Sequence, residues 1–323
     1  MPAARHNSVS TRTLFSSRAK KQVGLGCWAF GGLYWGGQKD KDSFAAMSAA
    51  LDCGIDHWDT ALAYGNGRSE KLCGSFLEGR RDQVFLATKG QLGKKPESLI
   101  KSLHKSLRNL HTDRVDLFYI HWPRSDIDMR PHMELLERER VKGTLRAIGV
   151  SNFSIEHMRQ ISEVGTIDAH QLCYSLYWRR HEQDSIPYCI EHGIPIITYS
   201  SLAQGVLTGK FPRSPHFDPG DQRPRTIFFQ KDVWPRLYEV TQALKEIARA
   251  LNCPLQHLAL QWLAQRPGVT QVLVGARNSH HIHQNAAAFD QQVSKKTIDR
   301  ITAISDGISA LYPNEENIFK FVP

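Results

Sequence analysis

Eight short apolar runs of strand length recur along the 323 residues, and a helix-length segment follows most of them. The segment 97–110 shows the helical period clearly, because it repeats leucine at Leu99, Leu103 and Leu107. The apolar runs lie at 23–26, 55–58, 84–88, 116–120, 146–150, 168–172, 194–199 and 271–274. They are more continuously apolar than alternating, which is typical of strands in a parallel sheet with both faces covered.

Eight strand–helix units are the number that a (β/α)8 TIM barrel requires. An open, doubly wound sheet is the alternative, and it commonly shows a G-x-G-x-x-G turn after its first strand. Here the first run continues as G-L-G-C-W-A over residues 24–29, which lacks the third glycine. We therefore expect an α/β fold, a TIM barrel with a parallel eight-stranded core, forming a single domain over residues 13–323.

Residues 1–12 are expected to be a disordered tail. The segment 1–20 contains Ser and Arg but no acidic residue, a composition that also suits a transit peptide. Six cysteines are scattered singly, which is typical of reduced thiols in a cytoplasmic protein. No apolar stretch is long enough to span a membrane.

The formal charge of +9 raises the question of a nucleic-acid ligand. A nucleic-acid-binding protein concentrates its Lys and Arg residues along one face or element. In this chain the basic residues are spread over the sequence and are mixed with acidic residues, as in the segment 134–140. We therefore expect no nucleic-acid partner and only a mild attraction for small anionic ligands.

Polar side chains follow the ends of successive apolar runs. In a parallel barrel these ends meet at one mouth, where active sites lie. The residues concerned are Asp59, Lys89, His121, Ser151, Asn152, Gln171 and Tyr199. The recurrence of polar residues at successive strand ends predicts a functional site at the barrel mouth.

Four of the residues near these ends form a combination suited to general acid catalysis. A phenol has a pKa near ~10, and an ammonium beside it favours the phenolate and lowers that pKa. Lys89 is expected to do this for Tyr64, while Asp59 keeps Lys89 charged and directed. A neutral His121 is expected to donate a hydrogen bond to a carbonyl oxygen. The combination predicts Tyr64 as proton donor to a carbonyl whose carbon receives hydride, with no metal.

Long segments of the chain resemble the signatures of the aldo-keto reductases, from about residue 12 to 310. These are G-L-G-C-W-A-F-G-G at 24–32, W-D-T-A-L-A-Y-G at 58–65, A-T-K at 87–89, Y-I-H-W-P at 119–123 and the segment 143–153. The resemblance implies an NAD(P)H-dependent oxidoreductase acting on CH–OH or carbonyl groups, with the catalytic tetrad Asp59, Tyr64, Lys89 and His121. The opening W-A-F-G-G…W-G-G and V-G-A-R at 274–277 resemble bacterial members that act on small aldehydes or polyols.

The same resemblance implies where the cofactor lies. Ser151, Asn152 and Gln171 would hold the nicotinamide carboxamide, and Tyr199 would stack on the ring. The loop 199–211 is similar to the one that covers the pyrophosphate. The expected cofactor-binding residues are Trp28, Asp59, Ser151, Asn152, Gln171, Tyr199, Ser200, Leu202, Gln204, Gly205, Lys210, Arg223, Gly275, Arg277, Gln284 and Asn285.

The segment after the eighth strand departs from the family pattern. Many relatives have a Lys-Ser pair at the positions of Gly275 and Ala276 and an Arg at that of His281, all contacting the cofactor's 2′-phosphate. Arg277 is the residue that we assign to the 2′-phosphate here, since a guanidinium binds phosphate oxygens in pairs. We therefore expect NADPH as the cofactor, with NADH as the alternative.

A substrate pocket with aromatic walls is expected above the nicotinamide, formed by Trp28, Tyr34, Trp35, Trp122 and Trp178. It would take a small or aromatic carbonyl compound. The alternative function is a non-catalytic, NADPH-binding regulatory subunit of another complex. The histidines at 280, 281 and 283 have no acidic or Cys partner nearby, so we expect no metal site there.

Overall fold

The eight strands form a closed parallel barrel, as the sequence predicts. The computed structural model describes residues 21–312 and 317–319. The strands pair in chain order, and β1 closes the barrel by pairing with β8. Their bounds are β1 Val23–Gly26, β2 His57–Asp59, β3 Phe85–Gly90, β4 Val115–Ile120, β5 Leu145–Ser151, β6 Ala169–Cys173, β7 Ile196–Tyr199 and β8 Val269–Gly275. The expected tail at residues 1–12 lies outside the described residues.

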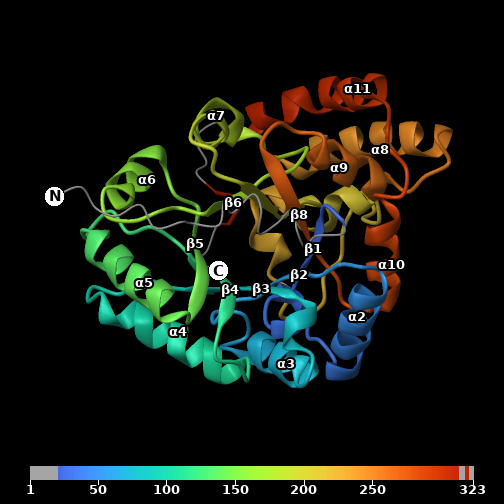
Figure 1. Cartoon of the computed structure of the whole chain (residues 1–323). Helices are drawn as coiled ribbons and strands as arrows, with labels where there is room; N and C mark the ends of the chain where they lie inside the picture. The colour runs from blue at the N-terminus through green and yellow to red at the C-terminus, as the bar shows by residue number, and fades with distance from the viewer. Residues whose placement is uncertain (1–20, 313–316, 320–323) are drawn as a thin grey trace.

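Helices surround the strands and cover their outer faces (Figure 1). Their bounds are α2 Asp40–Asp52, α3 Arg68–Leu77, α4 Glu97–Asn109, α5 Arg130–Lys142, α6 Ile155–Ser162, α7 Ser185–Glu191, α8 Trp234–Ala250, α9 Leu255–Ala264, α10 Ser279–Ala287 and α11 Lys295–Ser305. The leucine repeat of α4 explains its orientation, because Leu99, Leu103 and Leu107 are all buried on one face of that helix.

The barrel has two hydrophobic layers. One lies between the strands and the surrounding helices, and the other fills the interior of the barrel. The inner layer consists of Phe85, Ala87, Leu117, Tyr119, Ala147, Ala169, Ile197 and Leu273. Side chains alternate between the two faces of a strand, so the inner face of β3 carries Phe85, Ala87 and then Lys89. The same alternation places Asp59 of β2 and Gln171 of β6 inside the barrel. The inner face therefore changes from apolar to polar at the carboxyl ends of the strands.

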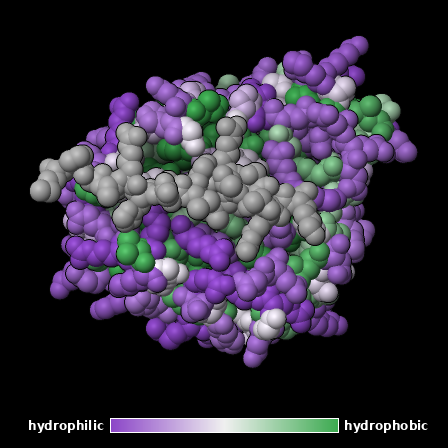
Figure 2. All heavy atoms as spheres, in the orientation of Figure 1, coloured by the Kyte–Doolittle hydropathy of each residue, from purple (hydrophilic) through white to green (hydrophobic). Residues whose placement is uncertain are grey.

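The outer surface is mainly hydrophilic on the face shown in Figure 2, where polar residues are spread over the helices. No helix in the described part of the chain has both the length and the apolar character needed to cross a lipid bilayer.

Candidate active site

Lys89 lies at the centre of a buried polar network at the carboxyl ends of β2 and β3. The residue is only 1% exposed. Its ammonium group forms an ion pair with Asp59 and donates hydrogen bonds to the Thr60 carbonyl at 2.9 Å and to the Tyr64 hydroxyl at 3.1 Å. A lysine ammonium has three N–H donors, and these three partners match them. The network therefore fixes the position of Lys89 beside the phenol.

Asp59 holds the charge of Lys89 in place. Burial is the largest effect on Lys89 and disfavours its charged form, but Asp59 and Tyr64 together outweigh it and raise the pKa of Lys89 above its ordinary value. The second carboxylate oxygen of Asp59 accepts a hydrogen bond from the Gln171 side chain at 2.9 Å. Gln171 comes from β6, so the network joins strands from opposite parts of the barrel wall.

The pKa of Tyr64 moves in the opposite direction from the sequence-based expectation. Burial raises this pKa, and the lowering effect of the Lys89 ammonium is not large enough to reverse it. Tyr64 therefore keeps its proton at neutral pH and can donate it. The Lys89 ammonium would stabilise a phenolate formed at this position.

A close backbone approach positions the loop that carries Tyr64. Gly65 has a φ of +61°, a left-handed conformation that favours glycine. A Cβ at Gly31 would lie 2.7 Å from the Gly65 nitrogen, so the two glycines allow their segments to touch. Through this contact the Trp28 and Tyr64 rings stack, with their centroids 6.0 Å apart.

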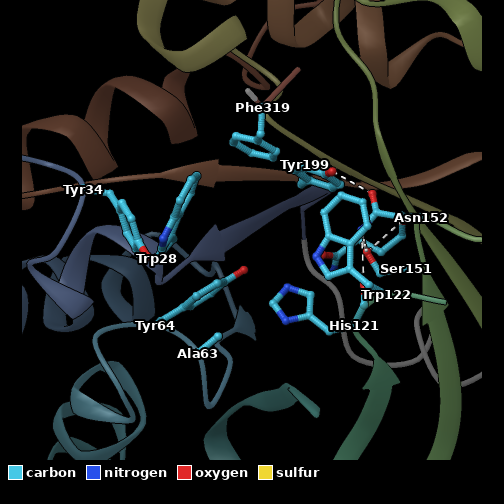
Figure 3. A pocket seen from close by; sticks show the side chains of 11 residues that line it. Trp28, Tyr34, Ala63, Tyr64, His121, Trp122, Ser151, Asn152, Tyr199 and Phe319 are labelled. Carbon is cyan, nitrogen blue, oxygen red and sulfur yellow. Dashed lines mark hydrogen bonds between the residues drawn. The ribbon is translucent and has the colours of Figure 1, made fainter. Parts of the chain in front are cut away.

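His121 faces the same space as Tyr64, and their ring centroids lie 6.0 Å apart (Figure 3). Burial lowers the pKa of His121 to about 3, and the Lys89 ammonium acts in the same direction. The imidazole is therefore neutral at physiological pH. Its Nδ1 atom is buried and has no hydrogen-bond partner within the described part of the chain.

A small pocket opens in front of these groups (Figure 3). Its lining residues are Trp28, Tyr34, Ala63, Tyr64, His121, Trp122, Ser151, Asn152, Gln171, Tyr199 and Phe319. Three of the five expected aromatic wall residues are present, namely Trp28, Tyr34 and Trp122. Trp35 instead lines the adjoining cleft, with its ring edge against Trp28 at 5.2 Å.

The placement of Trp178 in the substrate pocket is wrong. Its side chain is 1% exposed and stacks on Tyr312, with ring centroids 5.3 Å apart. Phe319 takes part in the wall that Trp178 was expected to form. Its ring meets that of Trp28 edge to face, with the ring centroids 5.7 Å apart. The main chain beside Phe319 is tied to the loop before α8, because Ile227 donates a hydrogen bond to the carbonyl of Ile318 at 2.9 Å.

A longer cleft continues from the pocket across the barrel mouth, and the two share Trp28, Tyr64 and Tyr199. The remaining residues assigned to the cofactor lie either in the pocket or in this cleft. In the pocket are Ser151, Asn152 and Gln171; the cleft is lined by Asp59, Ser200, Leu202, Gln204, Gly205, Lys210, Arg223, Gly275, Arg277, Gln284 and Asn285. The structure thus brings together segments from β1 through α10.

The far end of the cleft is positively charged. Partial burial lowers the pKa of Lys210, and the cations of Arg223 and Arg277 lower it further. Beside Lys210, the residues Gln204 and Gly205 have φ values of 55° and 92°. These left-handed residues form a tight turn in which the Gly205 N–H donates to the Leu202 carbonyl at 2.9 Å. The positive charges fit a ligand with phosphate groups.

The pocket, where it joins the cleft at Tyr199, has groups that fit an amide and a flat ring. The Tyr199 hydroxyl donates to the Asn152 side-chain oxygen at 2.7 Å, and the Asn152 amide donates to the Ser151 hydroxyl at 3.0 Å. Asn152 has a φ of 64°, which turns its side chain toward Tyr199. In the described residues, no group of three or more His, Cys, Asp or Glu side chains could hold a metal ion.

Several lining residues have no signal in the sequence motifs. Thr208, Gln256 and His281 line the cleft, and Phe319 lines the pocket. His281 was considered only as a departure from the family pattern. Thr208 lies within the family loop 199–211 but was not singled out, whereas Gln256 and Phe319 lie outside the segments that assigned the site, and tertiary packing brings them to it.

A closed parallel barrel with a buried lysine and aspartate, a half-buried tyrosine and a neutral histidine defines a barrel enzyme equipped for acid–base chemistry. The chain belongs to the aldo-keto reductases: the Aldo/keto reductase family matches residues 22–306. This confirms the predicted family and reaction class, namely NAD(P)H-dependent oxidoreduction of carbonyl groups.

Individual relatives support the same assignment. Aldo-keto reductase YhdN of Bacillus subtilis is 37% identical over 271 residues, covering 79% of this chain and 81% of its own length. The NADH-specific methylglyoxal reductase of Escherichia coli is 30% identical over 298 residues, or 84% and 91% of the two chains.

Solved structures give the same result. The glycerol dehydrogenase AKR11B4 from Gluconobacter oxydans has a TM-score of 0.81 and 29% identity, with 94% and 95% of the two chains covered. A Klebsiella pneumoniae aldo-keto reductase in complex with NADPH has a TM-score of 0.72 and 26% identity, with coverage of 93% and 95%.

Proposed function

We propose that this protein is an NADPH-dependent reductase of small aldehydes or ketones in which Tyr64 donates the proton. The observation that carries the proposal is the Tyr64 hydroxyl, which lies 3.1 Å from the Lys89 ammonium and faces the pocket at the junction with the cleft. NADPH, when bound, supplies a hydride to the carbonyl carbon. The chain supplies the proton, the orientation and the charge stabilisation.

The proton transfer follows from the network around Lys89. As hydride adds to the carbonyl carbon, the oxygen gains negative charge and takes the phenolic proton of Tyr64. The phenolate left behind faces the Lys89 ammonium, whose charge Asp59 maintains. The neutral His121 is close enough to Tyr64 to hydrogen-bond the same oxygen, which stabilises its developing charge. Hydride and proton together convert the carbonyl group to an alcohol.

Cofactor binding is supported by the residues along the cleft. The amide groups of Asn152 and Gln171 would orient a carboxamide, and the Tyr199 ring would support the nicotinamide. Lys210, Arg223 and Arg277 would bind the phosphates. Arg277 lines the same cleft and adds a further cation close to Lys210, which favours NADPH over NADH.

The substrate class is supported by the size and lining of the pocket. A volume of about 40 Å³ leaves room for roughly three water-sized groups. Aromatic walls from Trp28 and Trp122 exclude water from the reacting carbonyl. Two relatives are named for methylglyoxal and glycerol, which are three-carbon compounds. A short aldehyde or ketone therefore fits best.

The direct test is to follow the absorbance of reduced nicotinamide while the protein is mixed with NADPH and short aldehydes. Tyr64→Phe should lower kcat by roughly 10²- to 10⁴-fold, because it removes the proton donor. Tyr238→Phe, on α8 and away from the cleft, is the matched control. Turnover that persists in Tyr64→Phe would disprove the proton donor. Binding of NADPH without turnover in the unmodified protein would favour the regulatory subunit instead.

A further inference from the structure

Gln38 forms a two-point contact with Arg277 that no catalytic motif accounts for. The Gln38 side-chain amide donates to the Arg277 carbonyl at 2.8 Å, and its oxygen accepts from Arg277 Nε at 3.0 Å. A third hydrogen bond between the two segments runs from Arg277 Nη2 to the carbonyl of Gly37. The two residues are 239 positions apart in the sequence. The segment before α2 therefore holds the arginine that follows β8.

The contact uses only one edge of the guanidinium. Nε and Nη2 form that edge, and they face the Gln38 oxygen and the Gly37 carbonyl. A guanidinium has further N–H donors on Nη1 and Nη2, which point along its other edge. Within the described residues, Nη1 of Arg277 forms no hydrogen bond to the protein. This second edge is left for a ligand in the cleft, which Arg277 lines.

Gln38 is itself held firmly. Its side-chain nitrogen also donates to the Ser43 hydroxyl of α2 at 3.2 Å. Its backbone carbonyl accepts a hydrogen bond from Arg68 at 3.0 Å, and the other Arg68 nitrogen donates to the Phe30 carbonyl at 2.6 Å. Arg68 begins α3, four residues after Tyr64. Gln38 can therefore orient Arg277 without moving in response to it.

We propose that Gln38 is a positioning residue that sets the preference for NADPH over NADH by aiming the free edge of Arg277 at the cofactor's 2′-phosphate. This inference rests on the proposed function. An arginine that must be ordered on binding loses side-chain entropy, and an arginine already fixed does not pay that cost. NADH has no 2′-phosphate, so its binding does not use Arg277. The effect of Gln38 is therefore confined to NADPH.

The test measures the Kd of NADPH and of NADH through quenching of tryptophan fluorescence, since Trp28 and Trp35 line the cleft. Gln38→Leu should raise the Kd for NADPH about fivefold and leave the Kd for NADH unchanged, as expected when the guanidinium loses its one hydrogen bond to the Gln38 oxygen. Gln38→Glu should raise it more than tenfold, because a carboxylate neutralises Arg277 and repels the phosphate. Gln265→Leu is the matched control, because Gln265 also bonds a backbone carbonyl but lies away from the cleft.

A double-mutant cycle shows whether Gln38 acts through Arg277. Gln38→Leu should have no further effect on the NADPH Kd once Arg277→Leu is present. Additive effects, an unchanged Kd for NADPH in Gln38→Leu, or equal losses for both cofactors would overturn the proposal. If Gln38→Leu does not fold, the Kd values of NADPH and NADH are compared for Gln38→Glu instead. A melting curve shows that the variant used is folded. Failure of the unmodified protein to bind either cofactor would instead refute the proposed function.

Discussion

The two ends of the cleft are stabilised by different kinds of interaction. We call the end with Asp59, Tyr64 and Lys89 the catalytic end, and the end with Lys210 and Arg277 the phosphate end. At the catalytic end, Asp59 and Lys89 are buried and each is fully engaged by neighbouring protein groups. At the phosphate end, Lys210 and Arg277 reach the surface and like charges lie side by side. Buried charges must be satisfied within the protein because water is excluded. Cations that wait for an anionic ligand must instead keep donors free.

This difference corresponds to two tasks. The proposed proton transfer requires a donor whose position varies little, and the network around Lys89, which has no spare donors, would provide it. Ligand binding requires charge that the protein does not neutralise. Arg223 is paired with Asp221, whereas Lys210 is repelled by Arg223 and Arg277, and this repulsion is the cost until an anion binds. Substitutions at the catalytic end should therefore affect turnover and stability together. Substitutions at the phosphate end should affect cofactor affinity alone.

The largest effect is expected for Lys89→Met. The substitution removes the ammonium that stabilises the phenolate and leaves the Asp59 carboxylate buried without its partner. Loss of one member of a buried ion pair costs about 3–5 kcal/mol of unfolding free energy. We expect kcat to fall by roughly 10³-fold in addition. Urea unfolding and steady-state kinetics measure the two effects.

Lys101→Met, on the exposed side of α4, serves as the control for the lost charge. If Lys89→Met were as stable as the unmodified protein, Asp59 would have to be neutral or otherwise paired. The contrast between the two ends of the cleft would then fail.

Arg277→Leu should show the opposite pattern. A charge-assisted hydrogen bond contributes about 1.5–3 kcal/mol, so the Kd for NADPH should rise roughly 10- to 100-fold. The Kd for NADH, the kcat at saturating NADPH and the unfolding free energy should change little. Arg236→Leu on α8 controls for the loss of a surface charge. Equal weakening of NADPH and NADH binding would place Arg277 on phosphates that both cofactors share.

The sequence placed Asp59, Tyr64 and Lys89 in one cluster, as the structure has them, because these residues occur in contiguous segments. Asp59 and Tyr64 are five residues apart, and Lys89 lies on the next strand. The alternation along β2 and β3 then fixes which side chains enter the barrel. The direction of the Tyr64 pKa was not predictable in this way, since burial is a property of the folded chain. Whether the effect of burial on the Tyr64 pKa exceeds the effect of Lys89 depends on every neighbouring group.

Residues placed by distant packing were predicted poorly. Trp178 lies beyond the end of β6 and was taken for a pocket residue, but Tyr312 covers it. Phe319 was missed because its position depends on a bridge to Thr226. Gln38 was missed for the same reason, as its partner Arg277 lies at the other end of the chain. Local patterns contain no information about such pairs, whereas strand periodicity does define the barrel.

The pH dependence of stability offers a smaller test at the catalytic end. Burial lowers the pKa of His121 to about 3, below the value of about 6.5 expected in the unfolded chain. Between these values the unfolded chain binds a proton that the folded protein does not, so stability falls as pH decreases from 6.5 toward 3. The slope from one such residue is about 1.4 kcal/mol per pH unit.

His121→Gln should therefore reduce the slope of unfolding free energy against pH by about that amount between pH 4 and 6. Urea unfolding at several pH values measures it, with the exposed His280→Gln as the control. An unchanged slope would mean that His121 is protonated in the folded protein. It would then act as a charged rather than a neutral hydrogen-bond donor.

His281→Arg should give the smallest change and would sharpen the description of the phosphate end. His281 lines the cleft, and its Nδ1 accepts a hydrogen bond from the Arg277 backbone at 3.4 Å. Burial lowers its pKa, and nearby Lys210 and Arg277 lower it further, so it is neutral at physiological pH. An arginine there adds a full charge beside the 2′-phosphate. The Kd for NADPH should fall about threefold to fivefold, with no change for NADH. Weaker binding would mean that repulsion among the existing cations already limits this end of the cleft, and that its open donors, rather than its net charge, determine affinity.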